Sequence, residues 1–290
     1  MPLPDFISPG RLASIACLLE VCAPKPGNVH RGADFDDVGF EDFVVSAEML
    51  GAVIDANLTL PVGEVILRVV KATRAHVGTN TNLGLALMLC PLARCAMMCD
   101  RMDESAISTV LMQLSQRDSE AFYKAIRIAK PAGMQPVNQL DVDGPAPSDI
   151  LAAMELASQR DLVARQYRDN FKNVFVDVVP ALLTGRLKFN SLREAIVFAH
   201  VSMISRFGDS LIARKCGEPA SVQAKRLAGQ AIEALEDGPE SYFSAVADLD
   251  FWMRADGHRR NPGTTADLIA AGLMVAMFNG DLEFSFGTDC

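Results

Sequence analysis

The chain has 290 residues, 50% of them hydrophobic, and a formal net charge of -9. This length suffices for a large buried core. An acidic chain without a basic stripe argues against a nucleic-acid-binding protein, whereas an anionic small molecule can still bind where Lys and Arg gather locally.

Apolar residues recur at helical spacing along most of the chain. A first helix follows Ser8-Pro9, because serine is a good N-cap and proline suits the first helical position. It ends before Pro24 and Pro26. Val174–Val179 fits a buried strand or a helix equally well. Further helices are expected at about residues 40–56, 61–77, 83–99, 103–116, 120–129, 148–157, 161–171, 191–207, 210–217, 219–236, 239–251 and 265–278.

These segments predict an all-α fold, with residues 1–290 forming one domain of about a dozen packed helices. Strand patterns are nearly absent. Lys130–Pro147 has four prolines and two glycines and is the longest irregular stretch, so we expect a lid or linker there. The apolar content suggests a homo-oligomer.

The cysteines and the N-terminus indicate the compartment. Seven cysteines, an odd number, lie mostly in apolar helical patterns. We expect no signal peptide, because the first residues lack a basic segment followed by an apolar run. We expect no transmembrane helix, because the sequence has no uncharged apolar stretch of about 18 residues. We therefore expect a cytoplasmic protein with free thiols and no membrane partner.

Four polar clusters interrupt the helices: Lys25–Asp37, Gly78–Gly84, Arg206–Gly217 and His258–Asp267. Helix N-termini near such clusters favour anions, and aspartates supply ligands for Mg²⁺ or a general base. Helix junctions at one end of a bundle can converge on one pocket. The clusters together predict a phosphate-substrate site with Mg²⁺, although each aspartate taken singly fits a helix cap or a surface charge.

The same clusters resemble, in order, the signature segments of the triphosphoribosyl-dephospho-CoA synthase family. The matching segments are PKPGNVH (24–30) with GADFDD (32–37), VGTNTNLG (77–84), GDS (208–210) with KCG (215–217), and NPGTTADLIA (261–270). Two departures from the family pattern stand out. Asn82-Leu83 replaces a His-Lys pair, and Asp34 replaces a histidine.

The resemblance implies an all-α transferase. It would move a triphosphoribosyl group from ATP, with release of adenine, to 3′-dephospho-CoA, and Mg²⁺ would assist. The matched positions imply catalytic roles for Asp34 and Asp209 and metal binding by Asp36, Asp37 and Asp267. The substrate-binding residues implied are Lys25, Pro26, Gly27, Asn28, Gly78, Thr79, Asn80, Gly84, Ser210, Lys215, Gly263, Thr264 and Thr265.

The altered second segment leaves two alternatives open. One is a related phosphoribosyl or glycosyl transfer to a different acceptor in cofactor biosynthesis. The other is a non-catalytic nucleotide-binding protein that has kept the fold. Release of adenine from ATP, measured with and without dephospho-CoA, separates these alternatives from the family reaction.

Overall fold

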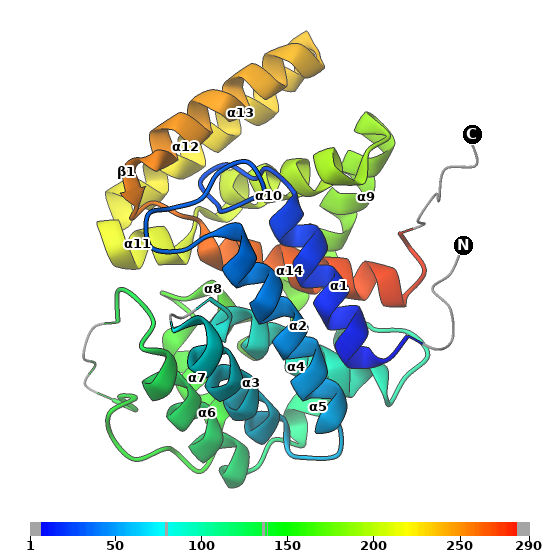
Figure 1. Ribbon diagram of the computed structural model, residues 1–290, viewed down its shortest axis with the longest axis vertical. Helices are drawn as coiled ribbons and strands as arrows, with labels where there is room; N and C mark the ends of the chain where they lie inside the picture. The colour runs from blue at the N-terminus through cyan, green and yellow to red at the C-terminus, as the bar shows by residue number, and fades with distance from the viewer. Residues whose placement is uncertain (1–6, 79–80, 135–136, 138, 283–290) are drawn as a thin grey trace.

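The computed structural model describes residues 7–78, 81–134, 137 and 139–282 (Figure 1). Within these ranges helices dominate, so the all-α prediction is confirmed, and one short strand, β1 (Ala255–His258), accompanies them. The helices are α1 (Pro9–Cys22), α2 (Phe40–Ala56), α3 (Val62–Val77), α4 (Leu83–Ala96), α5 (Glu104–Met112), α6 (Gln116–Ala129), α7 (Ile150–Ala157), α8 (Leu162–Arg168), α9 (Val179–Phe189), α10 (Leu192–Phe207), α11 (Ser210–Cys216), α12 (Glu218–Ala234), α13 (Pro239–Arg254) and α14 (Gly263–Phe278).

Side-chain caps fix many of the helix starts. The Ser8 hydroxyl accepts a hydrogen bond from the Arg11 N–H at 3.3 Å, as the sequence predicts for α1. Asp103 and Asp161 cap α5 and α8 in the same way. Helix α7 is capped by Asp149, one residue beyond the serine expected from the sequence, because its carboxylate reaches the Leu151 N–H at 2.8 Å.

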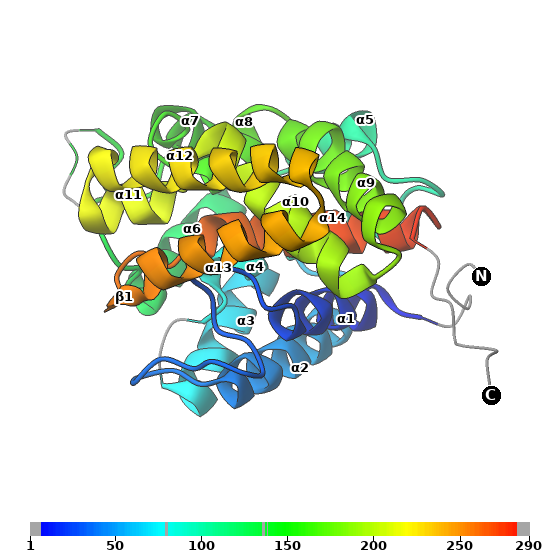
Figure 2. The ribbon, with the colours of Figure 1, turned by 90° about the horizontal axis from the view of Figure 1, so that it is seen from above.

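Helix α14 runs through the centre of the molecule and packs against α1, α4 and α10 (Figures 1 and 2). It is apolar on all sides, as expected for a core helix, and nearly every residue from Thr264 to Met277 is buried. No single described helix is long and apolar enough to cross a membrane. Only α10 and α11 taken together, bent by 60°, satisfy the length and composition criteria.

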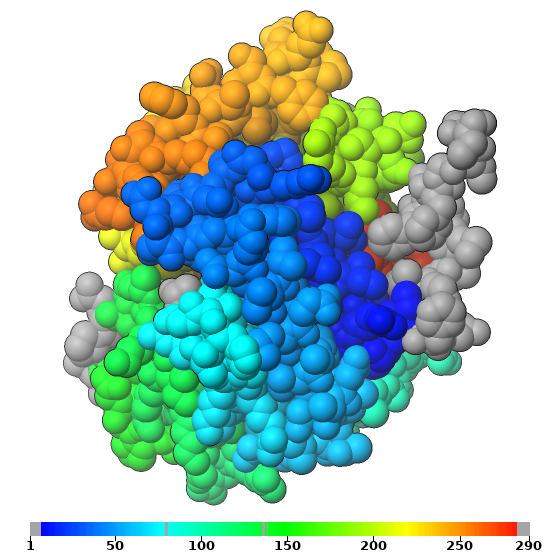
Figure 3. Space-filling model, viewed as in Figure 1, coloured from blue at the N-terminus to red at the C-terminus, as the bar shows by residue number. Residues whose placement is uncertain are grey.

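Two helices, α12 and α13, form a hairpin along one side of this core (Figure 2). The loop after α1 lies against α13 on the face shown in Figure 3. There the Gly27 N–H donates to Asp250 at 2.7 Å. A Cβ added at Gly27 would lie 2.6 Å from the Met253 sulfur. The backbone φ of 76° at Gly27 also favours glycine. This contact joins the N-terminal and C-terminal parts of the chain.

The segment that the sequence left open between strand and helix is helical. Val174–Val178 forms one turn of π-helix and continues directly into α9. π-Turns of this kind occur as local bulges within helices. The β-branched residues therefore belong to a helix and not to a sheet, with Val174 and Val178 buried and Val176 exposed.

The irregular segment 130–147 lies beside α6, and its described residues are anchored to that helix. The Tyr123 hydroxyl donates to the Leu140 carbonyl at 2.8 Å, and Arg127 Nε donates to the Val142 carbonyl at 2.6 Å. Gly133 packs against α11, where an added Cβ would lie 2.8 Å from Arg214 Cβ. This segment thus connects the α6 side of the molecule to α11.

Candidate active site

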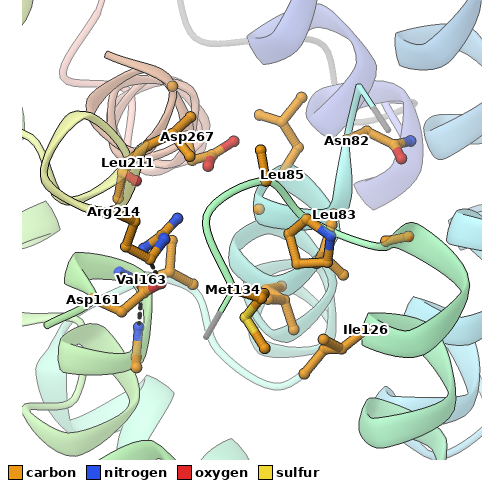
Figure 4. Close-up of a pocket in the computed structure, with 18 of the residues that line it drawn as sticks. Asn82, Leu83, Leu85, Ile126, Met134, Asp161, Val163, Leu211, Arg214 and Asp267 are labelled. Atoms are coloured by element: carbon orange, nitrogen blue, oxygen red, sulfur yellow. Dashed lines mark hydrogen bonds and ion pairs between the residues drawn. The ribbon is translucent and has the colours of Figure 1, made fainter. Parts of the chain in front are cut away.

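A cavity of about 550 Å³ lies between the loop after α1, the start of α4, the segment 130–142, α7, α11 and the first turn of α14. This volume falls within the range of small-molecule sites. Figure 4 shows Asp267, Arg214 and Asp161 on one side of it and Leu83, Leu85, Ile126 and Met134 on the other. We name the side with Asp267, Arg214 and Asp161 the polar wall, although Val163 and Leu211 also lie there, and the opposite side the apolar wall.

Two cations of α11 stand on the polar wall, and both have protein partners. Arg214 forms an ion pair with Asp161, the residue that caps α8. Lys215 Nζ donates to the His258 carbonyl at 2.6 Å and to Asn261 Oδ1 at 3.0 Å. Partial burial lowers the pKa of Lys215. Both contacts hold α11 against the segments that flank the cavity.

Asp267 presents a carboxylate to the cavity without a hydrogen bond or ion pair from any described residue. Burial raises its pKa well above the ordinary value, and the negative charges of Glu20, Asp209 and Asp161 raise it further. Gly84 lies directly against this carboxylate, since an added Cβ would approach Asp267 Oδ2 to 1.9 Å. Glycine is thus required at position 84 for Asp267 to occupy this position.

Lys25 lies in the protein interior and not on the cavity wall. Its side chain is 0% exposed. The ammonium lies 2.9 Å from Glu20 Oε1 and donates to the carbonyls of Ala23 and Glu20. Glu20 itself lines the cavity, and its pKa is raised by burial despite the opposing effect of Lys25. The lysine of the PKPG segment thus contacts the cavity through Glu20.

The rest of this segment divides between packing and the cavity. Pro26 is buried, and the Gly27 N–H is already bonded to Asp250. Asn28 lines the cavity, and its buried Oδ1 has no hydrogen-bond partner among the described residues. A buried amide oxygen without a partner is costly. Asn28 is therefore a candidate ligand-binding group.

The three aspartates of the first cluster lie in different places. Asp34 is exposed and accepts a hydrogen bond from the Phe40 N–H at 2.8 Å, at the start of α2. Asp36 is exposed and does not line the cavity. Asp37 does line it, and its Oδ1 lies 2.8 Å from His258 Nδ1. Of the three, only Asp37 can reach a ligand in the cavity.

Asp209 is fully buried and serves as an anchor between helices. Its Oδ1 caps α11 through the N–H groups of Leu211 and Ile212, and its Oδ2 accepts two hydrogen bonds from Thr265. Burial raises its pKa, and these bonds counteract the increase. The Ser210 hydroxyl similarly accepts a hydrogen bond from the Leu162 N–H and donates one to the Thr264 hydroxyl, each at 3.1 Å. Thr264 and Gly263 line the cavity, whereas Asp209, Ser210 and Thr265 lie behind it.

The second predicted segment reaches the cavity through Thr81, Asn82, Leu83 and Gly84. Gly78 is an exposed left-handed C-cap of α3 outside the cavity wall. Thr79 and Asn80 lie outside the described residues. Asn82 lines the cavity, with its amide nitrogen bonded to the Thr73 hydroxyl at 2.7 Å, and Gly84 supports Asp267.

Sequence reasoning missed several cavity residues that come from outside the four clusters. Arg74, Lys130 and Arg160 line the cavity, and no described residue forms an ion pair with them. Arg74 and Arg160 belong to basic helix faces that are visible in the sequence. The sequence alone does not show that these faces share a cavity with α14.

The donor set for a metal ion is small. The described residues hold no group of three or more His, Cys, Asp or Glu side chains that could bind a metal by themselves. Mg²⁺ is commonly held by one or two carboxylates together with substrate phosphates. The carboxylate of Asp267, which has no described partner, fits that mode of binding.

The described fold is all-α, and its cavity brings cations, carboxylates and apolar side chains together. The profile of the CitG family, ATP:dephospho-CoA triphosphoribosyl transferase, matches residues 7–285. The chain belongs to this family and is a triphosphoribosyl-dephospho-CoA synthase-type transferase, so the prediction from the sequence segments is confirmed.

A solved structure has the same fold. It is the crystal structure of a candidate triphosphoribosyl-dephospho-CoA synthase from Archaeoglobus fulgidus, with a TM-score of 0.60 and 23% sequence identity. The match covers 82% of this chain and 99% of that chain. No curated protein sequence matches the chain significantly.

Proposed function

We propose that this cavity binds ATP and 3′-dephospho-CoA together and transfers the triphosphoribosyl group from the first to the second. The main support is the match to the CitG family over residues 7–285. The cavity adds chemistry of the required kind, because cations and carboxylates face the same space.

The proposed reaction breaks the bond between ribose C1′ of ATP and the adenine nitrogen. A new bond joins C1′ to the 2′-oxygen of the acceptor ribose. The hydroxyl proton passes to a protein carboxylate and compensates for the proton that the adenine takes up when it leaves. Such transfers proceed through a sugar that resembles an oxocarbenium ion. The protein must therefore hold three phosphates, stabilise positive charge at C1′ and accept one proton.

Arg74, Lys130 and Arg160 are the candidates for holding the phosphates of the two substrates, Arg74 those of ATP and Lys130 with Arg160 those of the acceptor. Each lines the cavity, and none forms an ion pair with a carboxylate among the described residues, although the charge of Arg160 does act on Asp141. Each arginine guanidinium can bind two phosphate oxygens at once, and the ammonium of Lys130 adds a point charge. Asn28, Lys215, Gly263 and Thr264 add further polar groups to the cavity lining.

Asp267 and Glu20 are the candidates for the charge and proton steps. The Asp267 carboxylate can face a positive sugar without first breaking a bond to a described residue. Glu20 lies on the same cavity wall, and we assign it the proton from the acceptor hydroxyl. Lys25 stabilises the ionised form of Glu20 from behind.

The roles implied for Asp34 and Asp209 change in this proposal. Asp34 positions the start of α2, and Asp209 positions α11 and α14, so both act through other residues. Mg²⁺ would neutralise the triphosphate when bound. Asp267, with Asp37 at the edge of the cavity, would hold it, whereas exposed Asp36 lies outside the cavity wall.

The test is adenine release from ATP-Mg²⁺ by the purified protein. We expect the wild-type protein to release adenine only when dephospho-CoA is present. Glu20→Gln should lower kcat at least about 100-fold, as is typical when a general base is removed. The control is Glu240→Gln on α13, a residue outside the cavity wall. Adenine release that requires a different acceptor, or ATP binding without release, would reject the proposed reaction.

The cytoplasm is the proposed compartment, supported by the free thiols among the described residues. A homo-oligomer is a further proposal, to be checked by light scattering coupled to gel filtration. A monomer at micromolar concentration would rule it out.

A further inference from the structure

The apolar wall of the cavity has an unusual surface. We use the name apolar chamber for the part formed by α6, α7 and the described residues between them. Three of its residues, Met134, Leu140 and Leu156, are 49%, 37% and 48% exposed. Large exposed apolar side chains that gather around one cavity indicate a binding surface. The apolar chamber consists of Tyr123, Ile126, Met134, Leu140, Val142, Ile150, Ala153, Met154 and Leu156.

The backbone of this region is held in a costly conformation. Lys130 and Leu140 both have positive φ, 48° and 49°, which residues other than glycine, asparagine and aspartate rarely adopt. The Tyr123 hydroxyl fixes Leu140 by donating to its carbonyl at 2.8 Å. Both residues line the cavity. At Lys130 the positive φ belongs to the left-handed C-cap that ends α6. Leu140 is thus the strained residue on the cavity wall, and strain retained there points to a functional position for its side chain.

We propose that the apolar chamber binds the uncharged, largely aliphatic arm of the acceptor, the pantetheine part of dephospho-CoA. This inference rests on the proposed function and specifies where the second substrate lies. A long chain without charge can bury its methyl and methylene groups against Leu140, Ala153 and Leu156. The side chains of Met134 and Met154 can adapt to its irregular outline.

The chamber suits such an arm better than an adenine ring. Its one aromatic ring, Tyr123, is 3% exposed and has the Arg127 guanidinium over its face at 5.9 Å, so a purine has no open face to stack on. The Tyr123 hydroxyl is already bonded to Leu140. Gln139 is the only amide side chain that the described part of segment 130–142 adds to the cavity wall. Asp141 also lines this part of the cavity, but its two oxygens already accept from the N–H groups of Val137 and Asp143. The one free amide can pair with an amide of the arm but not with the several polar atoms of an adenine edge.

Charged residues at the ends of the chamber suit the rest of the acceptor. Lys130 directly follows α6, and Arg160 lies three residues beyond the end of α7, so each helix that walls the chamber leads to a cation. The pantetheine arm is joined to a nucleotide through a diphosphate. An arm in the chamber therefore places this diphosphate towards Lys130 and Arg160.

The experiment compares binding of dephospho-CoA with binding of ADP, which lacks the arm. Ala153→Phe fills the chamber, whereas Ala152→Phe places the same ring on the exposed side of α7. We expect Ala153→Phe to weaken dephospho-CoA binding at least about tenfold, a loss of about 1.4 kcal/mol. ADP binding and the KM for ATP should change less than about twofold, and Ala152→Phe should leave all three unchanged.

A milder pair of variants guards against misfolding. Leu156→Ser removes apolar surface from the chamber, and Leu187→Ser removes it from an exposed position on α9. Only Leu156→Ser should weaken dephospho-CoA binding, by about threefold to tenfold. If the wild-type protein is active but its chamber variants bind dephospho-CoA normally, this inference is overturned and the proposed function is not. The same holds if the variants lose ADP binding as much as dephospho-CoA binding. Wild-type protein that fails to bind dephospho-CoA overturns the proposed function as well.

Discussion

Asp209 Oδ2 accepts hydrogen bonds from both the N–H and the hydroxyl of Thr265, each at 2.8 Å. The other oxygen of the same carboxylate caps α11. One buried side chain therefore fixes α11 against the first turn of α14. These two elements carry Lys215 and Asp267 into the cavity, so Asp209 determines where both of them stand.

Asp209→Asn should destabilise the protein by about 1–3 kcal/mol, because an amide cannot accept all the hydrogen bonds that the carboxylate accepts. Urea unfolding measures this loss. Activity should fall in proportion to the misplacement of α11, and Thr265→Val, which removes only the hydroxyl bond, should cause a smaller loss of both. A stable Asp209→Asn protein without turnover would instead support the direct catalytic role implied by the sequence segments.

Gly84→Ala should reduce both stability and activity, because the new Cβ would lie 1.9 Å from Asp267 Oδ2. Overpacking of this kind costs about 1–3 kcal/mol. Gly229→Ala on α12 is the matched control, since nothing lies within 4 Å of its added Cβ. There alanine should stabilise by about 0.5–1 kcal/mol through helix propensity. Equal effects of the two substitutions in thermal unfolding would contradict the close contact at position 84.

Asp267→Asn should stabilise the protein at neutral and higher pH while removing activity. The folded-state pKa of Asp267 is raised above the unfolded value, so the stability due to its protonated form is lost as pH rises through the folded pKa. Asparagine is neutral throughout. The Tm difference between the variant and wild type should be near zero at pH 4 and exceed about 2 °C at pH 8. Asp143→Asn, an exposed control, should show no such trend.

Arg74→Gln should raise the KM for ATP by about tenfold, the usual effect of losing a hydrogen bond to a charged group. Arg68→Gln is the control on the same helix, because Arg68 is exposed and does not line the cavity. The effect of Arg74→Gln should shrink at high salt, where phosphate contacts are screened. An unchanged KM for ATP together with a raised KM for dephospho-CoA would show that Arg74 binds the acceptor instead of ATP.

Most of the helical layout could be predicted because its signals are local. Ser8-Pro9 and Asp103 mark helix starts through caps, and Gly78 marks an end through its left-handed conformation. The π-turn at Val174–Val178 was not predicted, because its residues have the same apolar character as a strand or an ordinary helix. The division of the chain into domains stays a prediction.

The site was harder to predict, because sequence segments identify polar residues without showing how their atoms are used. Lys25 and Asp209 stand in family segments, yet both are fully bonded inside the protein. Arg160 stands outside these segments and lines the cavity. A polar side chain at a helix junction has two uses, capping and ligand binding. Only the three-dimensional packing decides between them.

The position of α14 has a consequence for synthesis of the protein. Among the described residues this helix comes last, and it packs against α1, the first (Figure 1). Ribosomes add about 5–20 residues per second, and N-terminal segments emerge first. The faces that α1 and α4 turn towards α14 thus remain uncovered until α14 itself has been made. A chain cut short before Gly263 would lack the centre of its core, so we expect it to aggregate and not to fold into a smaller active form.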